Sequence, residues 1–497
     1  MASTAASSQP FMVQKNNLRI LFIADIRGEL SKLNILASEY NADLIVHTGN
    51  FGFLDEGSVM RIHESYLRHI VEFSPLLSED LIIKISKLSK VTGDNVEHFS
   101  SDNENLKSLL RDQQISELHK LLSRELKLDV PVYTIYGMCE DSLVINKFKH
   151  DVYTVPNLFI LDDSTFHTVR AKSGETILLA GLGGSLSYHK LFHQGTQFDP
   201  KEIREDGILK PGVVDVSGDP GNLWITILQL GRLIQTLSDY STRYPEAYEK
   251  AIKIFITHQS PTREPLLEHL SIFFKMDYTI SNSLHFKYTS SYNELSINPS
   301  FEAFKIKFNE ARTKLACIWK NIQQKYEELL FKSEDPNLLA YLELALEVFD
   351  KIPVSTKGAG EILPLALVRP DYDSDADIGN GKSGATGPKS KELISIIRQL
   401  NDLYYIAFQN SWHFNLCDLH YGTLVLGLSK GEVAMQCHSK GFDFGYRYAS
   451  DEFHDDDEGK IHANPKPVRG GRASRGGPPR GGPRGRGSRG GYRGSRD

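Results

Sequence analysis

The sequence predicts an α/β fold, and two patterns lead to this prediction. Short apolar runs at 18–25 and 43–48 flank a segment, 31–40, whose apolar residues have helical spacing, which predicts a β-α-β opening with two parallel strands. Further apolar runs of similar length recur along the chain, and each is followed by a loop-like segment. With 497 residues and 40% apolar composition, the chain can bury a sizeable core.

The elements of the first half are predicted in order from the same patterns. A turn at Arg27-Gly28 ends the first strand. Residues 58–127 are rich in helix-forming residues but contain a polar stretch at 92–105, which predicts helices around a loop. An amphipathic helix is predicted at 222–240. Further strands are predicted at 130–137, 157–163, 176–184, 253–261 and 277–288.

The second half begins with a helical block at 301–352. A Gly/Asp/Ser/Lys-rich stretch at 369–390 predicts a mobile loop, and a helix is predicted at 389–408. Two strand-like runs within 411–448 predict a closing β-hairpin that rejoins the main sheet. The expected organisation is a disordered N-terminus at 1–16, a core at 17–300 with its helical insertion at about 58–127, a helical insertion at 301–368, a flexible loop at 369–390, a helix and closing strands at 391–448, an acidic linker at 449–468 and a disordered tail at 469–497.

The chain lacks the sequence signals of a membrane or secreted protein. No apolar run approaches the roughly 20 residues that a bilayer-spanning helix needs, and the first residues lack a signal-peptide pattern. The four cysteines are scattered and form no CxxC pair, so neither a disulfide framework nor a zinc module is predicted. We expect a soluble protein in the cytoplasm, with an additional nuclear pool as the alternative.

The last 29 residues have the composition of an RNA-binding arm. They contain four RGG triplets, nine arginines and one acid, for a net charge of +8, and because the whole chain carries −6, the other 468 residues carry −14. Glycine leaves the backbone unrestrained, and arginine both grips phosphate and stacks on unpaired bases, so a disordered RNA-binding tail is predicted. The residues expected to contact RNA are Arg469, Arg472, Arg475, Arg480, Arg484, Arg486, Arg489, Tyr492 and Arg493.

Two alternatives for this tail stay open. It can be a solvated linker, or it can contact acidic protein surfaces, such as those of protein partners. The acidic stretch at 451–458 can compete with RNA for the arginines, or it can be a solvated spacer. The arginines are also candidates for methylation, which keeps their charge but weakens their bidentate hydrogen bonds.

Polar residues follow several of the predicted strands, where α/β folds place their sites. The strand ends read Ala24-Asp25-Ile26-Arg27, Thr48-Gly49-Asn50, Tyr136 to Asp141, Thr257-His258 and Asn282-Ser283-Leu284-His285. This order and spacing resembles the calcineurin-like metallophosphoesterase superfamily, whose motifs are DxH, GD, GNH, a lone His and GHxH. The runs YLRHIVEFSPLL, YGMCED, YHKLF, THQSPTREPLL and TISNSLHFKY are similar to those of an uncharacterised fungal branch of that superfamily, which often carries an RGG-rich end.

The resemblance implies a four-layer α/β/β/α sandwich and a degenerate member of the superfamily. In the superfamily, two cations share a bridging carboxylate from the Asp of GD, and their ligands are completed by the DxH pair, the Asn of GNH and three histidines. Asp25, His258 and His285 match that ligand set. The other positions hold Arg27 for a His, Asn50 for the bridging Asp, Met138 for the Asn, Cys139 for the catalytic His and Ser283 for a His.

These replacements predict that no two-metal centre forms. A neutral amide cannot bridge two mutually repelling dications, and a thioether is a poor ligand for hard ions. Arg27 would project a fixed positive charge into a cation site. No cofactor is therefore expected, with a single divalent ion such as Mn²⁺ or Zn²⁺ at Asp25, His258 and His285 as the fallback. Cys139 has no assigned histidine partner, so a buried inert thiol is favoured over a nucleophile.

Arg27 itself suggests a further hypothesis. Its guanidinium could replace a lost cation and hold a phosphate-containing ligand without hydrolysing it, and the alternative is a local salt bridge with Asp25. The function that we expect is a pseudo-phosphoesterase body acting as an RNA-binding or ribonucleoprotein scaffold through its RGG tail, with no confident catalytic residue. The alternative is a divergent metal-dependent phosphoesterase that acts on RNA, nucleotides or phosphoproteins.

Overall fold

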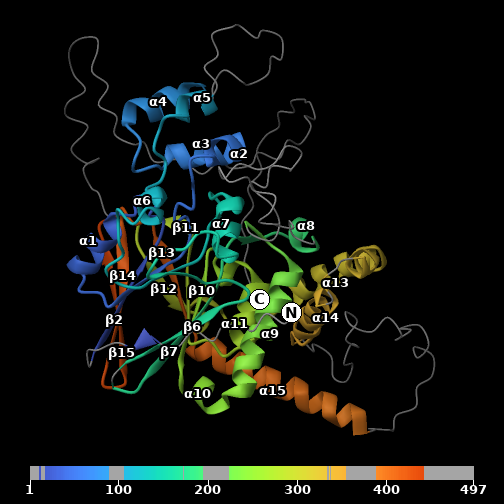
Figure 1. The fold of residues 1–497 in the computed structure, drawn as a ribbon. Helices are drawn as coiled ribbons and strands as arrows, with labels where there is room; N and C mark the ends of the chain where they lie inside the picture. The colour runs from blue at the N-terminus through green and yellow to red at the C-terminus, as the bar shows by residue number, and fades with distance from the viewer. Residues whose placement is uncertain are drawn as a thin grey trace, which may run out of the picture. The chain divides into compact units, whose positions relative to one another are not determined.

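The computed structural model shows a mixed α/β protein built on two large mixed sheets (Figure 1). The part of the chain that it describes comprises residues 11–12, 17–88, 106–171, 173–193, 223–332, 335, 337–353 and 388–441, with the backbone alone described at 11–12, 88, 285 and 388–397. No helix among these residues is long and apolar enough to cross a membrane. The α/β prediction is therefore confirmed.

The six-stranded sheet contains the predicted β-α-β opening. Strands β2 (Leu18–Ile23) and β3 (Leu44–His47) pair in parallel, with Ile20 opposite Leu44, and helix α1 (Lys32–Glu39) connects them. This confirms the predicted β-α-β opening, because two consecutive strands that pair in parallel need a crossover connection and α1 lies in that connection. The strand order is β15-β14-β2-β3-β4-β5, with β4 at Val132–Thr134, β5 at Leu158–Ile160, β14 at Gly422–Ser429 and β15 at Glu432–Ser439.

The seven-stranded sheet holds the later strands. Its central strands β7, β10, β11 and β13 run parallel to one another, and β6 and β12 pair antiparallel beside them. The strand order is β1-β6-β7-β10-β11-β13-β12, with β1 at Phe11–Met12, β6 at Phe166–Arg170, β7 at Thr176–Leu182, β10 at Ile252–Thr257, β11 at Tyr278–Phe286, β12 at Ser290–Asn293 and β13 at Trp412–Cys417.

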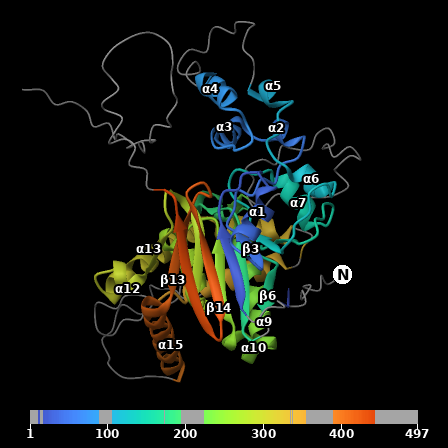
Figure 2. The ribbon, with the colours of Figure 1, turned by 90° about the vertical axis from the view of Figure 1, so that its left-hand side faces the viewer.

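The closing strands differ from the prediction. The first apolar run of 411–448 divides at a turn, where Tyr421 N–H donates to the Asp418 carbonyl, into β13 and β14. β13 enters the seven-stranded sheet beside β11, whereas the β14–β15 hairpin joins the six-stranded sheet beside β2. Figure 2 shows the red strand β14 next to the blue strands from the start of the chain. Alternating apolar residues look the same in either sheet, so the sequence could not reveal this division.

One apolar core is shared by the two sheets, and helices cover their outer faces. The shared core takes side chains from both, for example Phe22 and Leu426 from one sheet and Leu179, Ile254 and Ile280 from the other. The outer face of the seven-stranded sheet is covered by α9 (Ile227–Arg243), α11 (Pro265–Phe273), α13 (Phe301–Phe331), α14 (Leu338–Asp350) and α15 (Pro388–Asn410). The outer face of the other is covered by α1, α6 (Leu118–Leu122) and α7 (Ser142–Lys149).

Helix α9 begins later than predicted for a local reason. Trp224–Ile225 form the short strand β9, which pairs with β8 (Ser185–Leu186), and Thr226 then caps the helix in a capping box with Gln229. The other short elements are α8 (Tyr188–Leu191), α10 (Pro245–Lys250), the 3₁₀ turn Pro261–Arg263 and α12 (Glu294–Ile297). The predicted mobile loop at 369–390 lies outside the described residues except for the first turn of α15, which starts at 388.

The helical insertion has a small core of its own. Leu67, Ile70, Ile85, Leu106 and Leu110 are buried together. Its helices are α2 (Ser58–Arg61), α3 (Glu64–Glu72), α4 (Glu79–Leu88) and α5 (Leu106–Leu110), followed by α6. The predicted helices are thus confirmed, whereas the predicted loop at 92–105 lies outside the described residues. A separate core allows the insertion to hold α3 in a fixed position over the strand ends described below.

Candidate functional site

The loops that follow β2 and β3 have an unusual backbone. Asp25, Arg27 and Asn50 have positive φ angles of 55°, 47° and 59°. For residues other than glycine this left-handed region costs energy, and such residues concentrate at functional or tightly constrained sites. Backbone hydrogen bonds hold the two loops together, because Asp25 N–H donates to the Gly49 carbonyl and Arg27 N–H to the Asn50 carbonyl.

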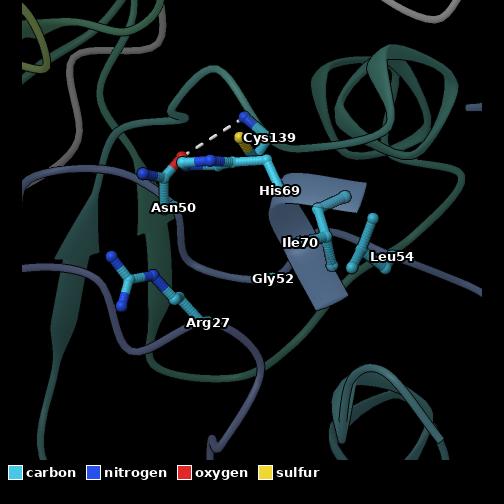
Figure 3. A pocket seen from close by; sticks show the side chains of 7 residues that line it. All are labelled: Arg27, Asn50, Gly52, Leu54, His69, Ile70 and Cys139. Carbon is cyan, nitrogen blue, oxygen red and sulfur yellow. Dashed lines mark hydrogen bonds between the residues drawn. The ribbon is translucent and has the colours of Figure 1, made fainter. Parts of the chain in front are cut away.

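Asn50 is the hub of the site. Its Nδ2 donates to Asp25 Oδ1 at 2.7 Å, and its Oδ1 accepts from the backbone N–H groups of Met138 and Cys139 at 3.1 and 3.3 Å. The bond to Cys139 is the dashed line in Figure 3. An aspartate here could accept from Met138 and Cys139, but it could not donate to Asp25. Asn50 therefore uses both its amide nitrogen, as a donor, and its amide oxygen, as an acceptor.

Arg27 provides the positive charge next to Asp25. Its Nη2 lies 3.5 Å from Asp25 Oδ2 and donates to Asp418 Oδ2 at 3.1 Å. The guanidinium also lies over the ring of Phe73, 5.0 Å from its centroid, at the end of α3. Arg27 thus makes the local salt bridge that the sequence suggested, extended by Asp418. An anion that approaches Arg27 has to compete with this carboxylate.

Asp25 sits in an environment that disfavours its charge. Its side chain is fully buried, and within the described part of the chain Oδ2 has no hydrogen-bond partner. Burial raises the pKa of Asp25 to about 6, with Asp418 adding to the increase and Arg27 opposing it. Near neutral pH, a larger fraction of Asp25 is consequently protonated than of an exposed aspartate.

His258 comes to the same place from the other sheet. It follows β10, and its Nδ1 lies 3.0 Å from Asn282 Oδ1 and 3.4 Å from the Thr48 carbonyl. Gly49 permits this approach, since its φ is 108° and a β-carbon there would lie 2.8 Å from the same ring nitrogen. Asp25, Asn50 and His258 are therefore brought together around the loop at 48–50.

The remaining predicted positions contribute less. The Ser283 hydroxyl accepts from Ser260 N–H at 3.1 Å, which ties β11 to the loop after β10. His285 lies in β11, and its side chain is outside the described part of the structure, so the fallback set of three ligands stays a prediction. The tail arginines and Tyr492 also lie outside the described residues.

Cys139 is a protonated thiol in this setting. Burial, reinforced by the nearby carboxylates of Glu140 and Asp25, raises the pKa of Cys139 to about 12. Glu140 accepts backbone N–H groups from Gly52 and Gly137 at 3.0 and 2.8 Å, and its role is to bind the loops together. A thiol with so high a pKa is a poor nucleophile at neutral pH.

A small pocket opens beside these residues. Its lining comes from the strand-end loops and from α3, and its volume of about 20 Å³ is enough for roughly one water molecule. Figure 3 shows its lining residues, which are Arg27, Asn50, Gly52, Leu54, His69, Ile70 and Cys139. Because α3 supplies His69 and Ile70, the insertion covers the site and narrows it.

In comparison with known proteins, part of the chain matches a family model. Residues 288–447 match the model of a protein family of unknown function, DUF2433. No curated protein matches the chain. The matched segment runs from just before β12 through β15 and includes Asp418, whereas the residues predicted for the degenerate site all precede it.

Three contacts of this site were missed by sequence reasoning. Asp418 directly follows β13, and its position at the carboxyl end of a parallel strand could have marked it as a candidate site residue. Asn282, which orients His258, is one residue from the predicted Ser283. Phe73 had no signal, because nothing in the sequence indicates that α3 reaches the strand ends.

Proposed function

We propose that the two-sheet body is a metallophosphoesterase-like α/β/β/α sandwich without metal-dependent turnover, and that the protein acts as a ribonucleoprotein scaffold through its RGG tail, 469–497. The shared core between two sheets, with helices outside both, supports the fold assignment. The positions of Asp25, Asn50, Met138 and His258, each after a parallel strand, support the correspondence with the superfamily's motifs.

The hydrogen bond from Asn50 to Asp25 carries the proposal. In the superfamily the position of Asn50 supplies the anionic bridge between two cations. Here it supplies an N–H donor directed at the one remaining carboxylate. Arg27 then places a guanidinium 3.5 Å from the same carboxylate, where a cation would need to bind. A divalent ion would have to displace both groups to reach Asp25.

The narrow pocket supports the absence of turnover. A phosphoester needs room for its phosphoryl group and for an attacking water in line with it. The pocket beside Arg27 has room for about one water, and α3 lines it. With Cys139 protonated and so little room in the pocket, the strand-end site is suited to holding loops in place.

The distribution of charge supports the scaffold role. The body and linker carry −14 and repel nucleic acid over most of their area, while the tail carries +8. RNA contact therefore falls to the tail, and the body is left as a surface for proteins.

The experiment compares wild-type full-length protein with Asp25→Asn and His258→Ala, each treated with chelator and then dialysed against Mn²⁺ or Zn²⁺. Bound metal is measured by elemental analysis, and turnover is measured on a generic phosphodiester and on RNA. We expect no turnover and no metal whose retention depends on Asp25 or His258. Turnover that His258→Ala abolishes, together with metal that Asp25→Asn releases, would contradict the proposal and favour the divergent phosphoesterase.

A further inference from the structure

A second group of potential ligands lies on other elements of the body. Glu268 of α11, Glu294 of α12 and His413 of β13 are 1%, 1% and 2% exposed, and one ligand atom from each lies within 4.8 Å of the others. His413 is the second residue of β13, and Asp418 follows the strand's last residue, so about 17 Å of strand separates this cluster from the strand-end loops. The two sites are therefore distinct.

His413 directs an unsatisfied nitrogen into this cluster. Its Nδ1 lies 2.7 Å from the Thr279 hydroxyl, whereas its Nε2 has no hydrogen-bond partner among the described residues and lies 3.8 Å from Glu294 Oε1. Burial, reinforced by the Lys307 ammonium, lowers the pKa of His413 to about 3, so the imidazole is neutral. A neutral imidazole held through Nδ1 by a neighbouring side chain is the usual state of a metal-binding histidine.

The carboxylates also lack a full set of partners. Glu268 Oε1 is buried with no hydrogen bond from any described group. Lys307 is the nearby cation, with its Nζ 2.6 Å from Glu268 Oε2 and 3.2 Å from Glu294 Oε1. One ammonium cannot balance two ionised buried carboxylates, so burial raises the pKa of Glu268 and this side chain carries a proton in the absence of metal, which a bound cation can replace. The cluster accordingly has a place for one more positive charge.

The lysine is able to leave when such a charge arrives. Its side chain is 26% exposed, unlike the three ligand residues, and its ammonium also lies 4.9 and 5.2 Å from the ring centroids of Phe304 and Phe308. A lysine at the edge of a core can turn its ammonium to solvent while its methylenes stay in contact with apolar neighbours.

We propose that Glu268, Glu294 and His413 form a binding site for a single divalent transition-metal ion of the Zn²⁺ or Mn²⁺ class. Two carboxylate oxygens and one imidazole nitrogen are a donor set that suits these ions and that leaves a further position for water. The ion joins α11, α12 and β13, and so ties the helical layer to the end of the seven-stranded sheet. Its role is structural, and it is independent of the strand-end loops.

The test titrates chelator-treated full-length protein with Zn²⁺ and, separately, Mn²⁺ by calorimetry. We expect one ion per chain for the wild type, and an association constant at least about 10-fold lower for Glu268→Gln and for His413→Gln. Glu268→Gln should still fold, because burial, with Lys307 opposing and Glu294 reinforcing it, raises the pKa of Glu268 to about 8, so glutamine resembles the form present without metal.

Two matched variants locate the ion. Glu264→Gln changes another buried, unsatisfied carboxylate at the start of the same helix and should leave binding unchanged. Lys307→Met removes the competing ammonium and should tighten binding. Binding that is equal in the wild type and in both ligand variants, or binding that only Asp25→Asn abolishes, would overturn the proposal. So would the absence of binding in the wild type and in Lys307→Met.

Discussion

At the scale of single residues, the strand-end site is a network of side chains that satisfy one another. Asn50 donates to Asp25 and accepts from two backbone N–H groups, so each of its two polar ends has a partner. Arg27 then shares its charge between Asp25 and Asp418. The result is a site in which an amide N–H group and a guanidinium together stabilise the buried carboxylate of Asp25.

Asp25 gives a pH-dependent prediction. Its pKa in the folded protein is raised from 3.8 to about 6, chiefly by burial. The folded state therefore binds more protons than the unfolded state between these values, and stability falls as the pH rises through this window. Asp25→Asn removes the cost of the buried charge, tolerates the positive φ and leaves Arg27 its bond to Asp418. We expect the variant to be more stable than wild type by about 1 to 3 kcal/mol at pH 7 and nearly equal at pH 4.

The measurement is the unfolding midpoint of both proteins at pH 4, 5, 6 and 7 with EDTA present. Asn50→Asp is the control with the opposite sign, because it replaces the donor to Asp25 with a second carboxylate and should lower the midpoint most at pH 7. If Asp25→Asn lowered the midpoint at pH 7 in metal-containing buffer but not in EDTA, Asp25 would be a metal ligand.

The sequence anticipated the residues of this site better than their partners. Asp25, Asn50, Cys139 and His258 could be placed because each follows a strand of recognisable pattern. Asp418 lies 391 residues from Arg27, and only the order of strands in the sheets brings them together. Such pairings depend on tertiary topology, which local periodicity does not encode.

At the scale of elements, the loops after neighbouring strands fit together too closely to admit even a methyl group. A β-carbon on Gly137, in the loop after β4, would overlap the Oδ1 of Asn50 in the loop after β3. Because Gly137 has no side chain, the two loops lie close enough for Asn50 Oδ1 to accept from the N–H groups of Met138 and Cys139. The types of the elements, strand or helix, could be predicted from the sequence. The sheet that β13 and β14 would each join could not.

Gly137→Ala tests this fit. Overlap with Asn50 should force the two loops apart and destabilise the protein by about 1 to 3 kcal/mol. Gly427→Ala in β14 is the matched control, because nothing lies within 4 Å of the added carbon. That variant should be neutral or more stable by up to about 1 kcal/mol. Urea unfolding midpoints compare the two, and equal midpoints would show that the loops can separate at no cost.

At the scale of the whole molecule, opposite charges are segregated along the chain. The tail is at +8 and the remainder at −14. The composition of the tail was evident from the sequence alone, since a glycine- and arginine-rich stretch needs no tertiary structure to define its chemistry.

Deletion of 469–497 should remove most crosslinking of the full-length protein to RNA. A second variant with every tail arginine changed to lysine keeps the charge but loses bidentate contacts and much of the stacking, so it should bind more weakly while keeping its salt dependence. Crosslinking yield and affinity at several salt concentrations measure both effects. Crosslinking that survives the deletion would place RNA binding on the body instead.

The division of the closing strands has a consequence for synthesis of the protein. Phe22 of β2 pairs with Leu424 of β14, and β11 pairs with β13 from the same late segment. At about 5 to 20 residues per second, a ribosome needs on the order of 20 to 80 seconds to make the intervening chain. Throughout that time, the edge of β2 that later pairs with β14 has no neighbouring strand. Strands of other molecules can pair with such an edge, which leads to aggregation. The two sheets can therefore be completed only after the segment that contains β13 and β14 has been synthesised.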